Sequence, residues 1–318
     1  MRRYALLFAF VSLCLPITVF SQTRTPESAL DHFKSAEKKI DRGDLDGAIE
    51  EYTRAIRLSS HLEGFNSSNR NRLGNSFDES SGEEITVIDP FTANAYNNRC
   101  LVRYKKSDFR GAIEDCNEAL RIRPGLPAAY LNRAAALRSM GKSEDALKDL
   151  DRAISLKKDF YEAYSNRGSL RLDMGDIHGA LEDLNRSIEL NDRTPESFYQ
   201  RGFTHIALKN YEQAVADFDR ALRLWPDMAW AYEGRGTALM QSGKMDQAIA
   251  NFTRALELDP QIVWAYYNRG LARVYIGNES DAQKDFSECL RLRPDLKAEL
   301  DAKIDLAREL RQQQKPMQ

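Results

Sequence analysis

The feature that most constrains this chain is a step of 34 residues. An aromatic residue recurs at this interval, and an arginine follows three positions after each aromatic residue. The aromatic residues are Tyr96, Tyr130, Tyr164, Phe198, Tyr232 and Tyr266. The arginines are Arg99, Arg133, Arg167, Arg201, Arg235 and Arg269. Self-similarity at a period of this length indicates an array in which each unit packs mainly on its neighbours. We therefore predict a linear stack of repeats.

Each repeat consists of two predicted helices. Tyr164, Gly168 and Leu172 recur every four residues and would share one face of a first helix. Gly175 interrupts this pattern, and a second apolar stripe starts at Ala180. A glycine after the first helix suits a left-handed cap, which we expect at Gly141, Gly175, Gly243 and Gly277. Small residues between the helices would let them approach closely, and these are Gly168, Gly202, Gly236 and Gly270.

The motifs resemble the tetratricopeptide repeat (TPR) family. Ala265–Gly270 has the pattern Ala-Tyr-x-Asn-Arg-Gly, and Ala248–Pro260 combines Ala-Ile-x-Asn-Phe with Ala-Leu-x-Leu-x-Pro. This resemblance implies an all-α fold, an α-solenoid of about seven helix–turn–helix TPR units in a right-handed superhelix. It also implies that the first helices line a concave groove, and that the ligand is an extended peptide or a partner protein.

The repeats divide the chain into segments. Residues 93–296 hold units 2–7, and residues 29–62 hold a weaker first unit that is out of phase with the others. Residues 63–92 between them are rich in Asn, Ser, Gly, Asp and Glu, so we expect a long polar loop, either mobile or functional. Residues 297–312 would form a capping helix with a polar outer side. Residues 313–318 should fray.

The first 21 residues differ from the rest of the chain. Arg2 and Arg3 precede an uncharged apolar stretch from Tyr4 to Phe20. This layout predicts a secretory signal peptide over residues 1–21, cleaved after Ser21. An uncleaved membrane anchor is the alternative, although about 17 residues is short for a membrane span. We expect an exported protein, periplasmic or extracellular, with no membrane attachment after cleavage.

The composition argues against several classes of function. The formal net charge is −2, and both signs are interspersed along the chain, so a basic face for nucleic acid is not expected. The histidines His32, His61, His178 and His205 do not have metal-ligand spacing. The acidic residues between Asp78 and Asp89 lack the oxygen spacing of a calcium loop. We predict no enzyme activity, no cofactor and no metal.

Side-chain amides recur just before the repeated arginine. They are Asn98, Asn132, Asn166, Gln200 and Asn268, and Gly234 interrupts the series. An amide both donates and accepts hydrogen bonds, so it can pair with a peptide backbone without selecting for sequence. The series resembles the asparagine ladder of some TPR grooves. The alternative is that these amides solvate the inner wall or cap local backbone.

Aromatic residues gather in the late repeats. Counted from the recurrent tyrosine, six of them should face or border the groove: Tyr199, Phe203, Trp230, Trp264, Tyr267 and Tyr275. Aromatic residues dominate binding hot spots, so this cluster could anchor apolar side chains of a ligand. The alternative is that they pack against the adjacent repeat.

An acid or its amide lies sixteen residues after each recurrent arginine. These partners are Asp115, Asp149, Asp183, Asp217, Asn251 and Asp285. We interpret the arginines as structural, pairing between the two helices of a unit rather than binding ligand. The lysines of the carboxylate clamp found in TPR co-chaperones are absent, since Asn97, Leu131 and Ser165 occupy the corresponding positions.

Three cysteines follow the signal segment. Cys100 and Cys116 should lie on facing helices of one repeat, where they could form a disulfide or remain thiols. We favour thiols, because two packed helix positions must also meet the geometry of the bond. Cys289 replaces a recurrent alanine and should be buried.

These features together predict a non-catalytic protein–protein interaction scaffold. It would bind an extended peptide or partner protein in its concave groove. Two other functions remain open, namely a structural subunit of an envelope or secretion assembly and an accessory module for an enzyme on another chain. The identity of the partner and the oligomeric state do not follow from the sequence.

Overall fold

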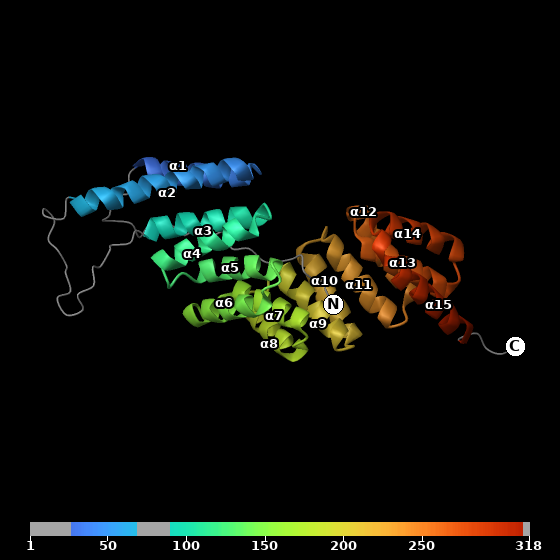
Figure 1. Cartoon of the computed structure of the whole chain (residues 1–318). Coiled ribbons are helices and arrows are strands. Elements are labelled where there is room, and N and C mark those ends of the chain that lie inside the picture. The colour runs from blue at the N-terminus through green and yellow to red at the C-terminus, as the bar shows by residue number, and fades with distance from the viewer. Residues whose placement is uncertain (1–26, 69–89, 314–318) are drawn as a thin grey trace. The chain divides into compact units, whose positions relative to one another are not determined.

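The computed structural model describes residues 27–68 and 90–313, and every regular element within these ranges is helical (Figure 1). The all-α prediction is therefore confirmed. The predicted signal peptide, most of the polar loop and the last five residues lie outside the described residues. The helices are α1 (Glu27–Asp41), α2 (Leu45–Ser68), α3 (Pro90–Lys105), α4 (Phe109–Ile122), α5 (Pro127–Ser139), α6 (Ser143–Leu156), α7 (Tyr161–Met174), α8 (Ile177–Leu190), α9 (Pro195–Ala207), α10 (Tyr211–Leu224), α11 (Ala229–Gln241), α12 (Met245–Leu258), α13 (Val263–Ile276), α14 (Glu279–Leu292) and α15 (Lys297–Gln313), with a 3₁₀ turn at Pro294–Leu296.

Consecutive helices pack as antiparallel pairs, and the pairs stack in chain order. α3 packs on α4, α9 on α10, α11 on α12 and α13 on α14. The second helices α2, α4, α8, α10 and α12 each contact the first helix of the next pair. This alternation is the stack of helix–turn–helix units that the 34-residue step predicts.

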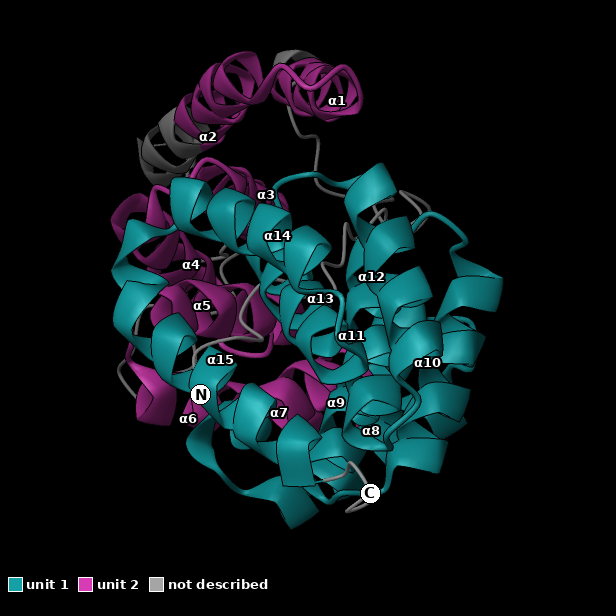
Figure 2. Cartoon of the chain, turned by 90° about the vertical axis from the view of Figure 1, so that its right-hand side faces the viewer, with its two compact units in different colours: residues 1–7, 171–318 teal, residues 8–170 magenta. Residues whose placement is uncertain are grey.

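The chain forms two compact units, coloured separately in Figure 2. The N-terminal unit holds the described residues up to Leu170, and the C-terminal unit those from Arg171 onward. The boundary falls inside α7 and therefore divides the repeat that α7 and α8 form. Among the described residues, no helix combines the length and the apolar character that crossing a bilayer requires.

A small residue on the first helix faces a large one on the second, sixteen positions later. A Cβ atom added to Gly202 would lie 2.8 Å from Cζ of Phe218, and one added to Gly236 would lie 2.7 Å from Cε1 of Phe252. Gly270 meets Phe286 in the same way. The missing side chains therefore provide the space that the phenylalanine rings fill, which confirms the predicted close approach of the helices.

Five of the six recurrent arginines are confirmed as links between paired helices, whereas Nη1 of Arg167 donates to Asp151 of the preceding repeat at 2.6 Å. In Arg99, Arg133, Arg201 and Arg269, both Nε and Nη2 donate to the aspartate sixteen residues later, over 2.6–3.2 Å. Nε of Arg235 donates to the amide oxygen of Asn251 at 2.7 Å. Each of the six guanidinium groups also lies over the aromatic ring three residues earlier, 5.2–5.7 Å from its centroid. The repeated aromatic residue and arginine thus form one structural unit.

The turns between paired helices use left-handed backbone, as predicted. Gly141, Gly175, Gly243 and Gly277 have φ angles between 76° and 90°. The turns after α3 and α9 have no glycine at this position, and Ser107 and Lys209 adopt φ angles of 63° and 61° instead. The repeat geometry therefore imposes the left-handed conformation even where a side chain makes it costly.

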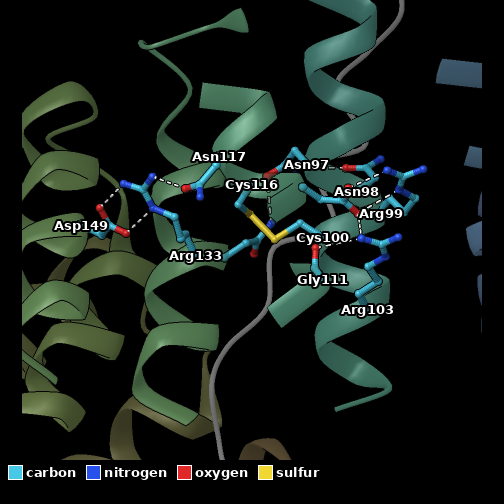
Figure 3. The surroundings of a disulfide bond; sticks show 12 residues. Asn97, Asn98, Arg99, Cys100, Arg103, Gly111, Cys116, Asn117, Arg133 and Asp149 are labelled. Carbon is cyan, nitrogen blue, oxygen red and sulfur yellow. Dashed lines mark hydrogen bonds and ion pairs between the residues drawn. A yellow bond between two sulfur atoms is a disulfide. The ribbon is translucent and has the colours of Figure 1, made fainter. Parts of the chain in front are cut away.

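The two cysteines of the second repeat form a disulfide, so the prediction of thiols is wrong (Figure 3). Cys100 and Cys116 occupy the two positions that hold glycine and phenylalanine in the later repeats. Their Cα atoms are 5.6 Å apart, within the range that a disulfide spans. Cys289 is a buried thiol, as expected, and burial raises its pKa to about 11.

The ends of the repeat array differ slightly from the predicted boundaries. α2 continues to Ser68, although the first unit was expected to end at 62, and α3 begins at Pro90 rather than at 93. Helix α15 occupies the place of the predicted cap. Its buried face consists of Leu300, Ile304 and Ala307, which pack with residues of α13 and α14, whereas Leu310 is exposed.

Candidate functional site

The C-terminal unit contains a recess formed by the first helices of three successive repeats. Its volume is about 30 Å³, enough for one or two water molecules. It is lined by Tyr199 and Phe203 of α9, Trp230, Glu233 and Thr237 of α11, and Trp264 and Asn268 of α13. We call this feature the aromatic recess. Five of its seven lining residues belong to the predicted groove.

The 34-residue step explains why these side chains meet. Trp230 and Trp264 each lie two positions before the recurrent aromatic residue, and Tyr199 and Glu233 lie one position after it. Equivalent positions on neighbouring first helices point in the same direction. The side chains therefore converge on one surface.

The aromatic rings of the recess have two different roles. Tyr199 and Phe203 are buried, with ring centroids 4.9 Å apart, and Phe203 packs edge-on against Phe218 at 5.2 Å. Trp230 and Trp264 are only half-buried. The packing alternative therefore describes Tyr199 and Phe203, while both tryptophans retain surface that a partner could contact.

A carboxylate lies at the polar side of the recess. Glu233 is 6% exposed, and its Oε1 accepts a hydrogen bond from the Thr237 hydroxyl at 3.1 Å and another from the Asn268 amide at 3.1 Å. The Asn268 amide nitrogen also lies 3.2 Å from the Thr237 oxygen. These contacts fix the position of the carboxylate among four aromatic rings.

The sequence prediction omits Glu233 and Thr237. Glu233 occupies the same position of the repeat as Tyr199 and Tyr267, and Thr237 occupies the same position as Phe203. The spacing could therefore have identified both residues. The predicted groove contains only aromatic and amide side chains, whereas Glu233 carries a carboxylate and Thr237 a hydroxyl group.

Three other predicted residues of the C-terminal unit lie outside the recess. Tyr267 is buried, packs edge-on against Trp264 with centroids 5.4 Å apart, and donates a hydrogen bond to Glu299 of α15 at 3.3 Å. Tyr275 is half-buried against the apolar cluster of α13–α15. Gln200 is 1% exposed.

Two of the predicted asparagines of the N-terminal unit, Asn98 and Asn132, are joined through Asn97. The Asn132 amide donates to Oδ1 of Asn97 at 3.0 Å, and the Asn97 amide donates to Oδ1 of Asn98 at 3.2 Å. The Asn98 amide reaches the hydroxyl of Tyr52 at 3.4 Å. Asn166 is buried at 2% exposure. Contact of these amides with a bound peptide stays a prediction.

The lining and the volume of the recess limit what it can hold. Its lining includes one carboxylate and no histidine, cysteine or lysine. Its volume is about a tenth of the smallest typical small-molecule pocket, roughly 300 Å³. Within residues 27–68 and 90–313, no group of acids, histidines and cysteines is arranged to hold a metal ion.

A second hollow of about 240 Å³ lies beside the start of α10. It is lined by Tyr211, Glu212, Val215, Ser242 and Lys244. None of these five side chains is buried, and none belongs to the predicted site. This hollow therefore has the character of ordinary surface.

Comparison with known families supports the repeat assignment. Models of the tetratricopeptide repeat match residues 131–197, 195–228, 236–277 and 265–296. The chain therefore carries tetratricopeptide repeats, and its all-helical fold is that of a TPR solenoid. No curated protein matches the sequence.

Solved structures show the same fold at low sequence identity. A tetratricopeptide repeat protein from Parabacteroides merdae is 18% identical, with a TM-score of 0.60 over 88% of this chain and 98% of that chain. The Cut9–Hcn1 hetero-tetramer of the APC/C gives 16% identity and a TM-score of 0.63, over 87% of this chain and 55% of that chain. A thermophilic TPR protein of Thermus thermophilus is 19% identical, with a TM-score of 0.50 over 57% of this chain and 98% of that chain.

Proposed function

We propose that this protein is a non-catalytic interaction scaffold that holds an extended segment of a partner protein along its first helices. The observation that carries the proposal is the aromatic recess, which three successive first helices line and where two of them expose a tryptophan beside a fixed polar group. A site shared by three repeats suits a ligand that runs from one repeat to the next. A polypeptide is such a ligand.

The composition of the recess supports an anchoring role. Interfaces obtain most of their affinity from a few residues, among which tryptophan and tyrosine are enriched. Trp230 and Trp264 are half-buried, so their rings are held by the fold and little conformational entropy remains to be lost on binding. The small volume admits the end of one side chain rather than a whole metabolite.

We also propose that the protein works outside the cytoplasm. The disulfide between Cys100 and Cys116 supports an oxidising compartment, because such bonds persist in secreted proteins and are rare in the cytosol. The basic and apolar pattern of residues 1–21 supports the same compartment.

The proposal is tested by capture of partner proteins from an extract of the exported fraction. The full chain serves as bait, together with Trp230→Ala/Trp264→Ala and, as a matched control, Trp225→Ala. Trp225 is 44% exposed and does not line the recess. We expect the double variant to lose at least about ten-fold in affinity for the captured protein, because truncating a hot-spot residue typically costs about 2 kcal/mol or more.

Two results decide between the functions. Loss of the same partner from the double variant but not from Trp225→Ala supports capture through the recess. Full retention by the double variant, with unchanged helical circular dichroism, contradicts the proposal and favours a structural subunit bound through another surface.

A further inference from the structure

We infer that His205 makes the helix pair α9–α10 sensitive to acid, so that protonation of its imidazole ring destabilises this pair. His205 lies in α9, opposite Asp217 of α10, and its side chain is 14% exposed. The inference rests on the position of His205 in the repeat and on the groups around it. It does not depend on the proposed function.

The position of His205 is occupied by arginine in three other repeats. Steps of 34 residues lead from His205 to Arg103, Arg171 and Arg273. Nη1 of each arginine lies within 3.2 Å of the aspartate twelve residues later. The two remaining repeats of this phase have Leu137 and Leu239 at this position. His205 is therefore the one residue of the series whose charge changes near neutral pH.

The imidazole ring does not make the contacts that an arginine makes at this position. Nε2 of His205 lies 3.7 Å from Oδ2 of Asp217, which is beyond hydrogen-bond distance. Nδ1 is buried and has no hydrogen-bond partner among the described residues. Both oxygens of Asp217 already accept hydrogen bonds from Arg201, at 2.7 and 2.9 Å. Because a protonated imidazole donates from both nitrogens, protonation would create a buried N–H group without an acceptor.

The surroundings of His205 favour its neutral form. Burial lowers the pKa of His205 below its ordinary value of 6.5, the Asp217 carboxylate acts against this effect, and the Arg201 guanidinium adds to it. The pKa is lowered overall because Asp217 is already paired with Arg201, so its attraction for an imidazolium ion is largely compensated.

The other helices packed on α9 are α8 and α11. Asn185 of α8, a neutral residue, accepts a hydrogen bond from Arg201 at 2.8 Å. In α11, Glu233 accepts hydrogen bonds from neutral side chains of α11 and α13, and Arg235 bonds to residues of α10 and α12. Asp217 and Arg201 are therefore the charged groups that act on His205.

The lowered pKa fixes the direction of the effect. The unfolded chain binds this proton more tightly than the folded chain does. The contribution of His205 to stability is therefore complete above pH 6.5 and is lost as the pH falls through the folded pKa. Phe203 and Phe218, whose rings pack edge-on between the same two helices, are close neighbours of His205 and Asp217 in the sequence. Acid thus acts on the helix pair that carries Phe203 of the aromatic recess.

The test compares the full chain with three variants. His205→Leu introduces the residue of two other repeats, and His205→Arg introduces the residue of three others. The matched control is His178→Gln, which removes an exposed histidine of the C-terminal unit.

Two measurements are made on each protein. Proton NMR follows the histidine ring signals from about pH 8 to about pH 5, and the signal that is missing in His205→Leu belongs to His205. Urea unfolding over the same pH range is followed by the fluorescence of the tryptophans, all of which lie in the C-terminal unit.

We expect the ring signal of His205 to titrate with a midpoint below 6.5. Between about pH 7.5 and about pH 5, the equilibrium constant for unfolding should increase at least about two-fold more in the wild type than in His205→Leu or His205→Arg, because neither variant has the titrating group. His178→Gln should behave as the wild type does.

Three results overturn the inference. The first is a midpoint of 6.5 or higher for His205, which would mean that the attraction of Asp217 outweighs burial. The second is an equal pH dependence of unfolding in the wild type and in the His205 variants. The third is the same loss of pH dependence in His178→Gln. If circular dichroism shows that His205→Leu disturbs the fold, His205→Arg decides the comparison.

Discussion

A single position of the repeat serves different purposes in different helices. The position two residues before the recurrent aromatic holds Trp230 and Trp264 in the aromatic recess. In α7 the same position holds Glu162, which is 8% exposed and whose Oε2 has no hydrogen-bond partner among the described residues. Burial raises the pKa of the Glu162 carboxyl above its ordinary value of 4.5. The repeat fixes where a side chain lies, and the identity of the residue decides its chemistry.

The raised pKa of Glu162 makes stability depend on pH. The folded chain binds the proton of this carboxyl more tightly than the unfolded chain does, so the contribution of Glu162 is most favourable below pH 4.5 and is lost as the pH rises through the folded pKa. We expect Glu162→Gln to increase the free energy of unfolding at pH 7. This increase should disappear below pH 4.5. Urea unfolding at a series of pH values measures this. A gain that is independent of pH, or one equalled by the control Glu182→Gln at an exposed acid of α8, would contradict the assignment.

At the scale of the helix pair, the side chains at two positions sixteen residues apart together fill one space between the helices. Gly270 and Phe286 divide the space in the last repeat, as Gly202 and Phe218 do two repeats earlier. In the second repeat a disulfide between Cys100 and Cys116 occupies the same place. The helix pair therefore tolerates several solutions to one packing problem, provided that the two positions change together.

The paired volumes predict a coupled mutational effect. Gly270→Ala places a methyl group against the Phe286 ring and should cost about 1–3 kcal/mol through overpacking. Phe286→Leu should relieve part of this cost, so that the double variant loses less stability than the two single variants added together. Urea unfolding followed by tryptophan fluorescence measures the three values.

A matched control is Gly125→Ala, at an exposed glycine with no atom within 4 Å of an added Cβ and with φ outside the left-handed range. Its effect should stay within about 1 kcal/mol of zero. Strict additivity of Gly270→Ala and Phe286→Leu would argue against shared volume as the organising feature of the helix pair.

At the scale of the whole chain, stabilising contacts are local. Apolar clusters join helices that follow one another, as in the cluster of α13, α14 and α15, and each compact unit has its own set of clusters. In arrays of this kind stability is close to a sum over repeats and their nearest neighbours. A change in one repeat should therefore affect distant repeats little.

The positions of the disulfide and of the tryptophans allow a test of whether the stabilising contacts are local. The disulfide lies in the N-terminal unit, and all three tryptophans, Trp225, Trp230 and Trp264, lie in the C-terminal unit. Reduction removes a cross-link between residues sixteen apart, which should cost that unit about 3 kcal/mol. We expect reductant to lower the first thermal transition seen by circular dichroism while the midpoint of tryptophan fluorescence changes little.

Two variants complete the comparison. The melting of Cys100→Ala/Cys116→Ala should not respond to reductant, and Cys289→Ala should respond as the wild type does. Equal shifts of both probes in the wild type would show that the chain unfolds as one cooperative body.

The prediction from sequence succeeds for features that each repeat sets on its own. The 34-residue step, the helix pair, the glycine turns and the pairing of Arg201 with Asp217 all follow from local spacing, since helix geometry converts a sequence offset into a direction. The same spacing identifies Trp230, Trp264 and Asn268 as neighbours on one surface. The structure places these three residues around one recess, and their contact with a ligand stays a prediction.

The residue pattern alone is enough to predict a stack of paired helices, because a periodic pattern fixes which face of every helix is buried. Which chemical groups come into contact between helices depends on the tertiary structure. The contact between Glu233 and Asn268 spans 35 residues, and the bond between Cys100 and Cys116 requires Cα atoms 5.6 Å apart. Such contacts depend on distances of a few ångströms between helices, which a pattern of residue types does not specify.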